Sequence, residues 1–151
     1  MLLYRLTRCI YANDLSGLGA RLYGGRWNSE GRSVIYLASS RSLAVLEALV
    51  HLRPKDIPDD YCMATIEAPD DIIEIDERRL PKGWQEVEDM DALKQVGNVF
   101  LYEKKSLLMK VPSAIVGMEY NFLLNPTHPD ARKVKVKNVK PFSFDSRLLE
   151  K

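Results

Sequence analysis

Four side chains that could bind an anionic, aromatic ligand lie within one short stretch of the chain, residues 17–51. Arg21 and Arg26 fall in a glycine-rich segment, Tyr36 in the apolar run that follows, and Glu47 in the next apolar run. A guanidinium presents a planar set of donors that matches phosphate oxygens. A tyrosine ring offers a flat apolar surface, and a carboxylate can accept a hydrogen bond from a sugar hydroxyl. These residue types on three successive elements predict a site for an anionic, aromatic substrate.

The glycine-rich segment is predicted to be a ligand-binding loop. Its glycines stand at positions 17, 19, 24, 25 and 31, and glycine is used where the backbone needs positive φ or approaches another group closely. The alternative is a surface loop with solvated arginines, which is the ordinary explanation for any single arginine. The presence of two arginines together with Tyr23 and Trp27 favours the ligand-binding interpretation.

The next two elements are predicted to be an interior strand and a helix. Residues 33–38 place apolar side chains on both faces, which is typical of a buried strand. On such a strand Tyr36 is either part of the core or one wall of a pocket. Residues 43–52 are nearly all apolar and predict a helix, with Ser39 or Ser40 as its N-cap and Pro54 preventing continuation.

Glu47 is the most informative residue of that helix. Apolar residues surround it at helical spacing, so its carboxylate is expected to emerge from an apolar face. A buried charge without a partner is costly, so something must satisfy this carboxylate. Two partners remain open on spacing alone: an internal arginine, or a ligand hydroxyl at the mouth of a cleft.

The second half of the chain contributes further polar candidates, Ser113, Asn121 and His128. Ser113 follows a proline, where a serine hydroxyl commonly caps local backbone. No G-x-S-x-G motif surrounds it, so a serine nucleophile is not expected. Asn125 precedes a proline and is expected to initiate a turn. His128 lies in the same proline-rich turn, and the sequence offers it no carboxylate partner.

Length and composition limit the class of protein. A chain of 151 residues with 46% hydrophobic and 28% charged residues predicts one globular domain, residues 1–151. A formal charge of +1 provides no general attraction to nucleic acid or to an anionic membrane. The N-terminal residues lack the apolar region of a signal peptide, and no segment reaches membrane-spanning length. We therefore expect a cytoplasmic protein that binds neither nucleic acid nor membrane directly.

The cysteines and histidines argue against disulfides and metals. Cys9 and Cys62 are the only cysteines, which indicates no disulfide framework and suits a reducing cytosol. Together with His51 and His128 they would form a zinc site only by contributions from the whole chain, so no metal is expected. The dinucleotide-binding pattern G-x-G-x-x-G is also absent, because Leu22 occupies its third glycine position.

The remaining chain is predicted to contain mostly strands. Strands are expected at residues 2–7, 61–67, 72–75, 114–116, 120–124 and 134–136. Residues 80–91 are expected to form a loop that turns helical toward Leu93, and residues 95–101 and 107–111 are short apolar pieces of uncertain type. The last strand alternates valine with lysine, a pattern of an edge strand.

The chain resembles RES-domain proteins, the toxins of RES-Xre toxin-antitoxin pairs. The resemblance rests on the passages GARLYGGRWN, VIYLA, VPSAIV and EYNFLLNPTHPD, together with the helix that carries Glu47, and covers nearly the whole chain. It implies an α+β fold similar to ADP-ribosyltransferase toxins, with two small, mostly antiparallel sheets, flanking helices and a central cleft. It also implies that NAD⁺ is the substrate, that no further cofactor is needed, and that NAD⁺ loss arrests growth.

The resemblance implies a role for each matching residue. Arg26, Tyr36 and Glu47 match the family's catalytic positions, Ser113 matches its serine, and Asn121 and His128 match further polar positions of substrate binding. Glu47 would stabilise positive charge on the ribose as nicotinamide departs, since this bond breaks much as a glycosidic bond does. Arg26 would hold the pyrophosphate, with Arg21 or Arg5 as alternatives, and Tyr36 would pack against nicotinamide or its ribose.

The acceptor stays open at this point. Water would make the protein an NAD⁺ glycohydrolase, phosphate a phosphorylase, and a protein side chain a mono-ADP-ribosyltransferase. Degradation of NAD⁺ is preferred because no segment of the sequence marks a protein-docking surface. A binding module without turnover is the alternative from another class. The resemblance further implies a partner, an Xre-type antitoxin with a helix-turn-helix domain.

Overall fold

The computed structural model describes residues 1–87 and 90–150. The strands are β1 (Leu2–Arg8), β2 (Ile35–Ala38), β3 (Tyr61–Glu67), β4 (Ile72–Glu74), β5 (Leu108–Pro112), β6 (Tyr120–Leu124) and β7 (Lys135–Phe142). The α-helices are α1 (Leu18–Tyr23), α2 (Arg41–Leu49) and α3 (Asp91–Glu103). Short 3₁₀ turns occupy several of the connections. Within these two described ranges, no helix is long and apolar enough to cross a membrane.

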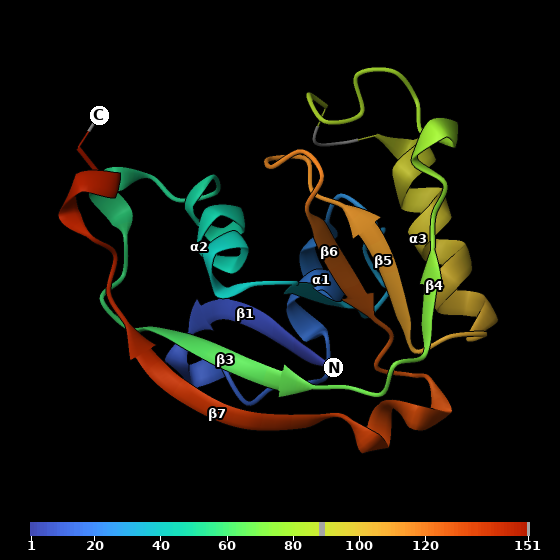
Figure 1. The fold of residues 1–151 in the computed structure, drawn as a ribbon, viewed down its shortest axis with the longest axis horizontal. Helices are drawn as coiled ribbons and strands as arrows, with labels where there is room; N and C mark the ends of the chain where they lie inside the picture. Colours follow the sequence, from blue (N-terminus) through green and yellow to red (C-terminus); the bar gives the residue numbers. More distant parts are fainter. Residues whose placement is uncertain (88–89, 151) are drawn as a thin grey trace.

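The strands form one sheet in the order β4-β5-β6-β2-β1-β3-β7. Neighbouring strands are antiparallel except β4 and β5, which run parallel. The expected α+β class and mostly antiparallel pairing are confirmed, but the expected division into two sheets is not. The reason is the pairing of Tyr4 with Ala38, which joins β1 to β2 and makes the two halves continuous. Figure 1 shows these halves as β4-β5-β6 on one side and β1-β3-β7 on the other.

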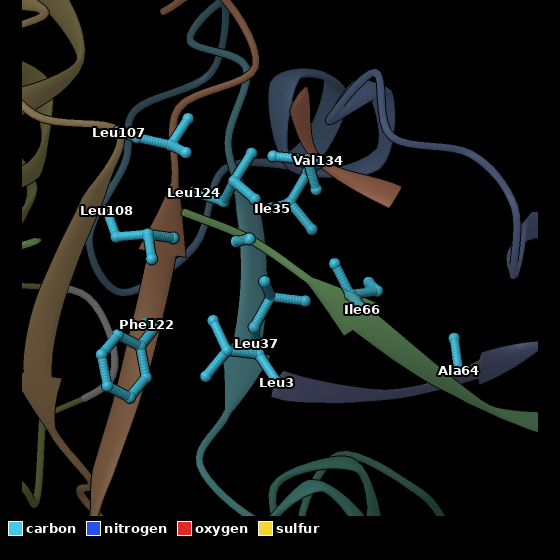
Figure 2. Close-up of a cluster of buried hydrophobic side chains, with 11 residues drawn as sticks. Leu3, Ile35, Leu37, Ala64, Ile66, Leu107, Leu108, Phe122, Leu124 and Val134 are labelled. Carbon is cyan, nitrogen blue, oxygen red and sulfur yellow. The ribbon is translucent and has the colours of Figure 1, made fainter. Parts of the chain in front are cut away.

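A core of buried apolar side chains fills the space between the two halves of the sheet. Figure 2 shows members of this cluster, among them Leu37 of β2, Ile66 of β3 and Phe122 of β6. Leu3, Leu108 and Leu124 are almost completely buried in the same cluster. The apolar residues on both faces of residues 33–38 are explained by this position, because β2 lies between β6 and β1.

The opposite face of the sheet is covered by α2 and α3. Leu43 and Ala44 of α2 pack on Ala38 and Met63. The long helix α3 packs its buried residues, Leu93, Gly97, Phe100 and Leu101, toward β5 and β6. In Figure 1, α2 lies over β1 and α3 lies beside β5 on the outer side of the sheet. The helix predicted around Glu47 is therefore confirmed, and Ser40 is its N-cap, since its hydroxyl accepts a hydrogen bond from the Leu43 amide at 3.1 Å.

Three short segments differ from the secondary structure expected from the sequence or were left undecided by it. The glycine-rich segment contains α1, a short helix that begins after Gly17 and ends at Gly24, both with positive φ. The strand expected at residues 114–116 is a bend instead, and a turn follows at residues 117–118. The uncertain run 95–101 belongs to α3, whose stripe of buried residues has helical spacing.

The expectation of unpaired cysteines is wrong, because Cys9 and Cys62 form a disulfide with their Cα atoms 4.8 Å apart. The antiparallel pairing of β1 with β3 places Thr7 opposite Cys62, and directly after β1 the chain turns into a 3₁₀ helix that begins at Cys9, two residues beyond Thr7. A separation of 53 residues in the sequence gives no hint of this register. The argument for a reducing compartment from free thiols therefore loses its basis.

Candidate functional site

The carboxylate of Glu47 is held by two side chains from the second half of the chain. Its Oε1 accepts a hydrogen bond from Ser113 Oγ at 2.8 Å and another from Asn121 Nδ2 at 2.5 Å. Ser113 is itself fixed, because its Oγ accepts hydrogen bonds from the amides of Ile115 and Val116. Ser113 thus caps the local backbone and orients the carboxylate at the same time. Among the described residues Glu47 has no arginine partner, so the internal ion pair considered above is not formed.

Strand register places Tyr36 beside this network. Ala38 of β2 is paired with Asn121 of β6, and Tyr36 is paired with Leu123, two residues further along each strand. Directly paired residues point to the same face of a sheet, and diagonal neighbours lie roughly 7–8 Å apart. Tyr36 and Asn121 therefore share the face that α2 covers, with Glu47 above Asn121.

Arg26 is positioned by the loop that precedes α3. Its Nη1 donates to the carbonyl of Trp84 at 2.7 Å and to the carbonyl of Val87 at 3.0 Å. Carbonyl groups orient a guanidinium without neutralising it, so Arg26 keeps its full charge for an anionic ligand. The rings of Trp84 and Trp27 pack together with their centroids 6.2 Å apart. This contact holds the residue that follows Arg26 against the residue whose carbonyl accepts its hydrogen bond.

The hydroxyl of Tyr36 has a structural role. It donates to Asn28 Oδ1 at 2.6 Å and accepts a hydrogen bond from the Trp27 amide at 3.1 Å. Asn28 is completely buried, and its Nδ2 donates to three backbone carbonyls of the surrounding loop. A Cβ added at Gly25 would lie 2.7 Å from the Tyr36 hydroxyl, so only glycine permits this close approach. Tyr36 therefore locks the loop that bears Arg26 and can offer a ligand only its ring.

Burial raises the pKa of Tyr36 to about 12, against the opposing effects of the Trp27 amide and the nearby Arg26 charge. Between pH 10 and about 12, the folded protein keeps the Tyr36 hydroxyl protonated, whereas the unfolded chain loses this proton near pH 10. Stability from this group is fully present below pH 10 and is lost as pH rises toward 12. The decrease in unfolding free energy across this interval is expected to reach at most about 2–3 kcal/mol. Urea unfolding between pH 9 and 12 measures it, and the Tyr36→Phe variant should show a smaller decrease than wild type.

Two oxygen atoms of the Glu47 and Asn121 side chains have no hydrogen bond to another described residue. Asn121 Oδ1 is buried without a hydrogen-bond partner among the described residues. Among the described residues, both hydrogen bonds to the Glu47 carboxylate end on Oε1. Its other oxygen, Oε2, is therefore left to accept a hydrogen bond from a ligand. Unpartnered buried oxygens are rare in folded proteins, so each calls for an explanation. The arrangement suits a ligand that donates hydrogen bonds, such as a ribose hydroxyl or a carboxamide.

The other predicted residues lie apart from Glu47. Arg21 is exposed on α1. Arg5 projects from the opposite face of β1 to Tyr4, where it donates to the Asp14 carbonyl at 2.8 Å and burial lowers its pKa. Asn121 lies near the start of β6, and His128 follows the end of that strand. The two residues are therefore separated by roughly 10 Å or more along the strand.

His128 belongs to a small polar cluster of its own. Its Nδ1 accepts a hydrogen bond from the Asp130 amide, and its Nε2 lies 3.7 Å from Asp71 Oδ2. The carboxylate partner that the sequence did not reveal is thus Asp71. These three side chains have the types of metal ligands. Internal contacts already engage them, since Asp71 accepts from the Leu107 amide and Asp130 pairs with Lys133 at 2.9 Å. As expected, Asn125 forms a turn, and it also binds the Leu101 carbonyl.

Two residues that are not among the predicted site residues support the loop that bears Arg26: Asn28, through its buried hydrogen bonds, and Gly97 of α3. A Cβ at Gly97 would lie 1.6 Å from the Trp27 carbonyl oxygen, so α3 contacts the Arg26 loop through this glycine. A glycine within an otherwise helical, apolar run was the available signal for such a close contact.

Comparison with known proteins was informative at the level of sequence. Residues 2–145 match the family model described as RES domain. A protein named "Toxin Res" from Photorhabdus laumondii is 41% identical over 156 residues, covering 99% of this chain and 98% of that protein. A protein named "Prs ADP-ribosylating toxin" from Sphingobium sp. is 38% identical over 149 residues, covering 96% of this chain and 92% of that protein.

Among solved structures, a chain in the crystal structure of the M. tuberculosis MbcT-MbcA toxin-antitoxin complex has the same fold. The TM-score is 0.77, and the match covers 94% of this chain and 84% of that chain. The sequence identity is 20%, so this likeness concerns the fold alone.

Proposed function

This chain belongs to the RES domain family, and on that premise we propose that it is the toxin of a toxin-antitoxin pair and cleaves NAD⁺ between nicotinamide and ribose. The observation that carries the proposal is the carboxylate of Glu47, fixed through Oε1 by Ser113 and Asn121, with Oε2 left for a ligand. The relatives named as toxins support the biological role.

Glu47 performs the electrostatic part of the reaction. As the bond to nicotinamide lengthens, positive charge develops on the ribose, and its hydroxyl groups become stronger donors. A hydrogen bond from a ribose hydroxyl to Glu47 Oε2 therefore strengthens in the transition state, which is the condition for lowering the barrier. Because Ser113 and Asn121 hold the carboxylate beforehand, no reorganisation is needed at that moment.

Arg26 and Tyr36 bind and orient the substrate. The guanidinium of Arg26 uses Nη1 for the loop carbonyls, and its remaining N–H groups are offered to the pyrophosphate. The ring of Tyr36 forms an apolar surface for nicotinamide or its ribose. Asn121 Oδ1 can accept a hydrogen bond from the substrate beside Glu47. Nicotinamide is a good leaving group, so neither a metal nor a covalent serine intermediate is part of the proposed reaction.

The acceptor that ends the reaction is water or phosphate in our preferred version. Water forms ADP-ribose, and phosphate forms ADP-ribose phosphate, with nicotinamide released in each case. Transfer of ADP-ribose to a protein side chain is the second candidate, because the relative that is 38% identical is named as an ADP-ribosylating toxin. All three reactions share the first step and the same roles for Glu47 and Arg26.

Product analysis tests the proposal directly. Purified protein is incubated with NAD⁺ alone, with inorganic phosphate, and with a cell extract, and the products are identified by mass. We expect free nicotinamide in each case, and the mass of the ADP-ribose product identifies the acceptor. A protein that binds NAD⁺ without releasing nicotinamide under any of these conditions would instead be a non-catalytic binding module.

The Arg26→Lys variant is expected to weaken NAD⁺ capture. Lysine keeps the charge but loses the planar donor set, so KM should rise about tenfold with a smaller change in kcat. Steady-state nicotinamide release measures both constants. Arg21→Lys is the matched control, since Arg21 is exposed on α1 in the same segment. A larger effect at Arg21 than at Arg26 would move the phosphate contact to α1.

The partner is proposed to be an antitoxin of the Xre type, with a helix-turn-helix domain that binds DNA. The support comes from the relatives named as toxins and from the fold shared with a chain of a toxin-antitoxin complex. Co-expression with an Xre-type antitoxin that binds this protein should suppress its release of nicotinamide, and copurification of the two chains measures their association.

A further inference from the structure

The face of the sheet beneath α2 carries one row of paired residues that runs through five strands. Asn121 is paired with Ala38, Ala38 with Tyr4, Tyr4 with Thr65, and Thr65 with Asn138. Direct pairing places all five side chains on one face. Glu47 of α2 is bonded to the Asn121 end of this row. The Thr65 end lies three strands away, or about 14 Å.

A cavity of about 470 Å³ opens at the Thr65 end of the row. Small-molecule sites have volumes of roughly 300–1,000 Å³, so the size is appropriate for a ligand. Its polar lining comes from α2, β3 and β7, through the residues Arg41, Ser42, Thr65, Asn138 and Lys140. Neither Glu47 nor Arg26 is part of this lining, so the cavity is separate from the site described above.

The chemistry of the cavity favours an anion. Arg41 and Lys140 are exposed cations, and the described residues that line the cavity include no carboxylate. The guanidinium of Arg41 is held 4.5 Å from the centre of the Tyr4 ring, which orients it without neutralising it. Two cations with hydroxyl and amide donors beside them form a common set for phosphate oxygens.

Thr65 provides a second, independent observation that points to a ligand. The residue is only 3% exposed, and its Oγ1 has no hydrogen-bond partner among the residues described. Buried hydroxyl groups without a partner are destabilising and uncommon in folded proteins. A donor or acceptor group of a ligand in the cavity would satisfy this oxygen. Met63 and Phe142 add apolar surface on the same wall, suited to a base or another flat group.

We infer that this cavity binds a phosphate-bearing small molecule, with the phosphate between Arg41 and Lys140 and the apolar portion against Met63 and Phe142. A nucleoside monophosphate has the required combination of charge and flat apolar surface. Glu47, Arg26 and Tyr36 do not line this cavity, so its contacts are separate from those proposed for NAD⁺ cleavage. The inference does not depend on cleavage of NAD⁺.

Calorimetric titration of the full chain tests the inference, with AMP as the probe and adenosine and inorganic phosphate as comparison ligands. The Glu47→Gln, Arg26→Ala double variant is used as background, so that binding at the first site is removed. We expect AMP to bind this background, and Lys140→Ala or Thr65→Val to raise its Kd at least about tenfold. Lys135→Ala on the same strand, outside the cavity, should leave the Kd unchanged.

The comparison ligands identify the source of the affinity. One outcome is that inorganic phosphate binds and that Lys140→Ala weakens its binding as much as that of AMP. That result would show that the cavity recognises a phosphoryl group of any origin, and it would support the inference. Binding of adenosine as tight as AMP would overturn the role of the cations. AMP binding that persists in Lys140→Ala and Thr65→Val, or no AMP binding to the background variant, would overturn the site. Thr65→Val preserves shape, and its thermal unfolding checks that the fold is retained.

Discussion

The Glu47→Gln variant is expected to lose NAD⁺ cleavage by about 10²–10³-fold, the cost of removing one preorganised electrostatic contact to a transition state. Glutamine keeps the shape of glutamate, and its Oε1 can still accept the hydrogen bonds from Ser113 and Asn121. The side chain should therefore stay in place while its negative charge is lost. The rate of nicotinamide release measures the effect, and growth after induced expression gives the cellular result.

The matched control for this substitution is Glu119→Gln. Glu119 is exposed in the turn after Ser113, and the same loss of charge there should leave the rate unchanged. Retained nicotinamide release and retained growth arrest in Glu47→Gln would refute the electrostatic role. A loss of rate accompanied by unfolding would point to Glu47 as a structural residue, and circular dichroism of the variant separates these outcomes.

The Gly97→Ala variant is expected to be destabilised by about 2–4 kcal/mol, although alanine is the better helix former. A Cβ at this position would lie 1.6 Å from the Trp27 carbonyl oxygen and 2.7 Å from its carbonyl carbon. These are backbone atoms, so α3 or the Trp27 loop must move. The midpoint of urea unfolding at constant m-value measures the change.

Gly19→Ala is the matched control for Gly97→Ala. Gly19 also lies in a helix, and beyond its chain neighbours and its own helix backbone no atom of the described residues lies within 4 Å of an added Cβ there. This variant should be as stable as wild type or up to about 1 kcal/mol more stable. Equal stability of the two variants would show that α3 adapts without cost.

Movement of Trp27 would also displace its neighbour Arg26, so Gly97→Ala should bind NAD⁺ more weakly than Gly19→Ala.

The disulfide and the sheet topology illustrate which features depend on long-range pairing. The positions of most strands were predictable, because alternation of apolar and polar residues is a local property. The partner of each strand was not, because register depends on contacts between residues far apart in the chain. The pairing of β1 with β2 through Tyr4 and Ala38 makes one continuous sheet, and the pairing of β1 with β3 brings the end of β1, where Cys9 follows, close to Cys62.

For the site, the sequence by itself determined the residue types and the local elements that carry them. Helical spacing around Glu47, the capping serine before α2 and the apolar run around Tyr36 were sufficient to predict a carboxylate and a ring from successive elements. These features are local, since helix caps and periodicity act over a few residues. The family resemblance then indicated which of the polar residues belong together.

Only the tertiary structure decided which groups touch. It brought Ser113 and Asn121 to one oxygen of Glu47, turned the Tyr36 hydroxyl toward Asn28, and left His128 with Asp71 at the other end of β6. Side-chain hydrogen bonds require atoms to meet within about 3 Å. Residues separated by more than sixty positions, such as Glu47 and Asn121, meet at that distance only after the strands have found their register.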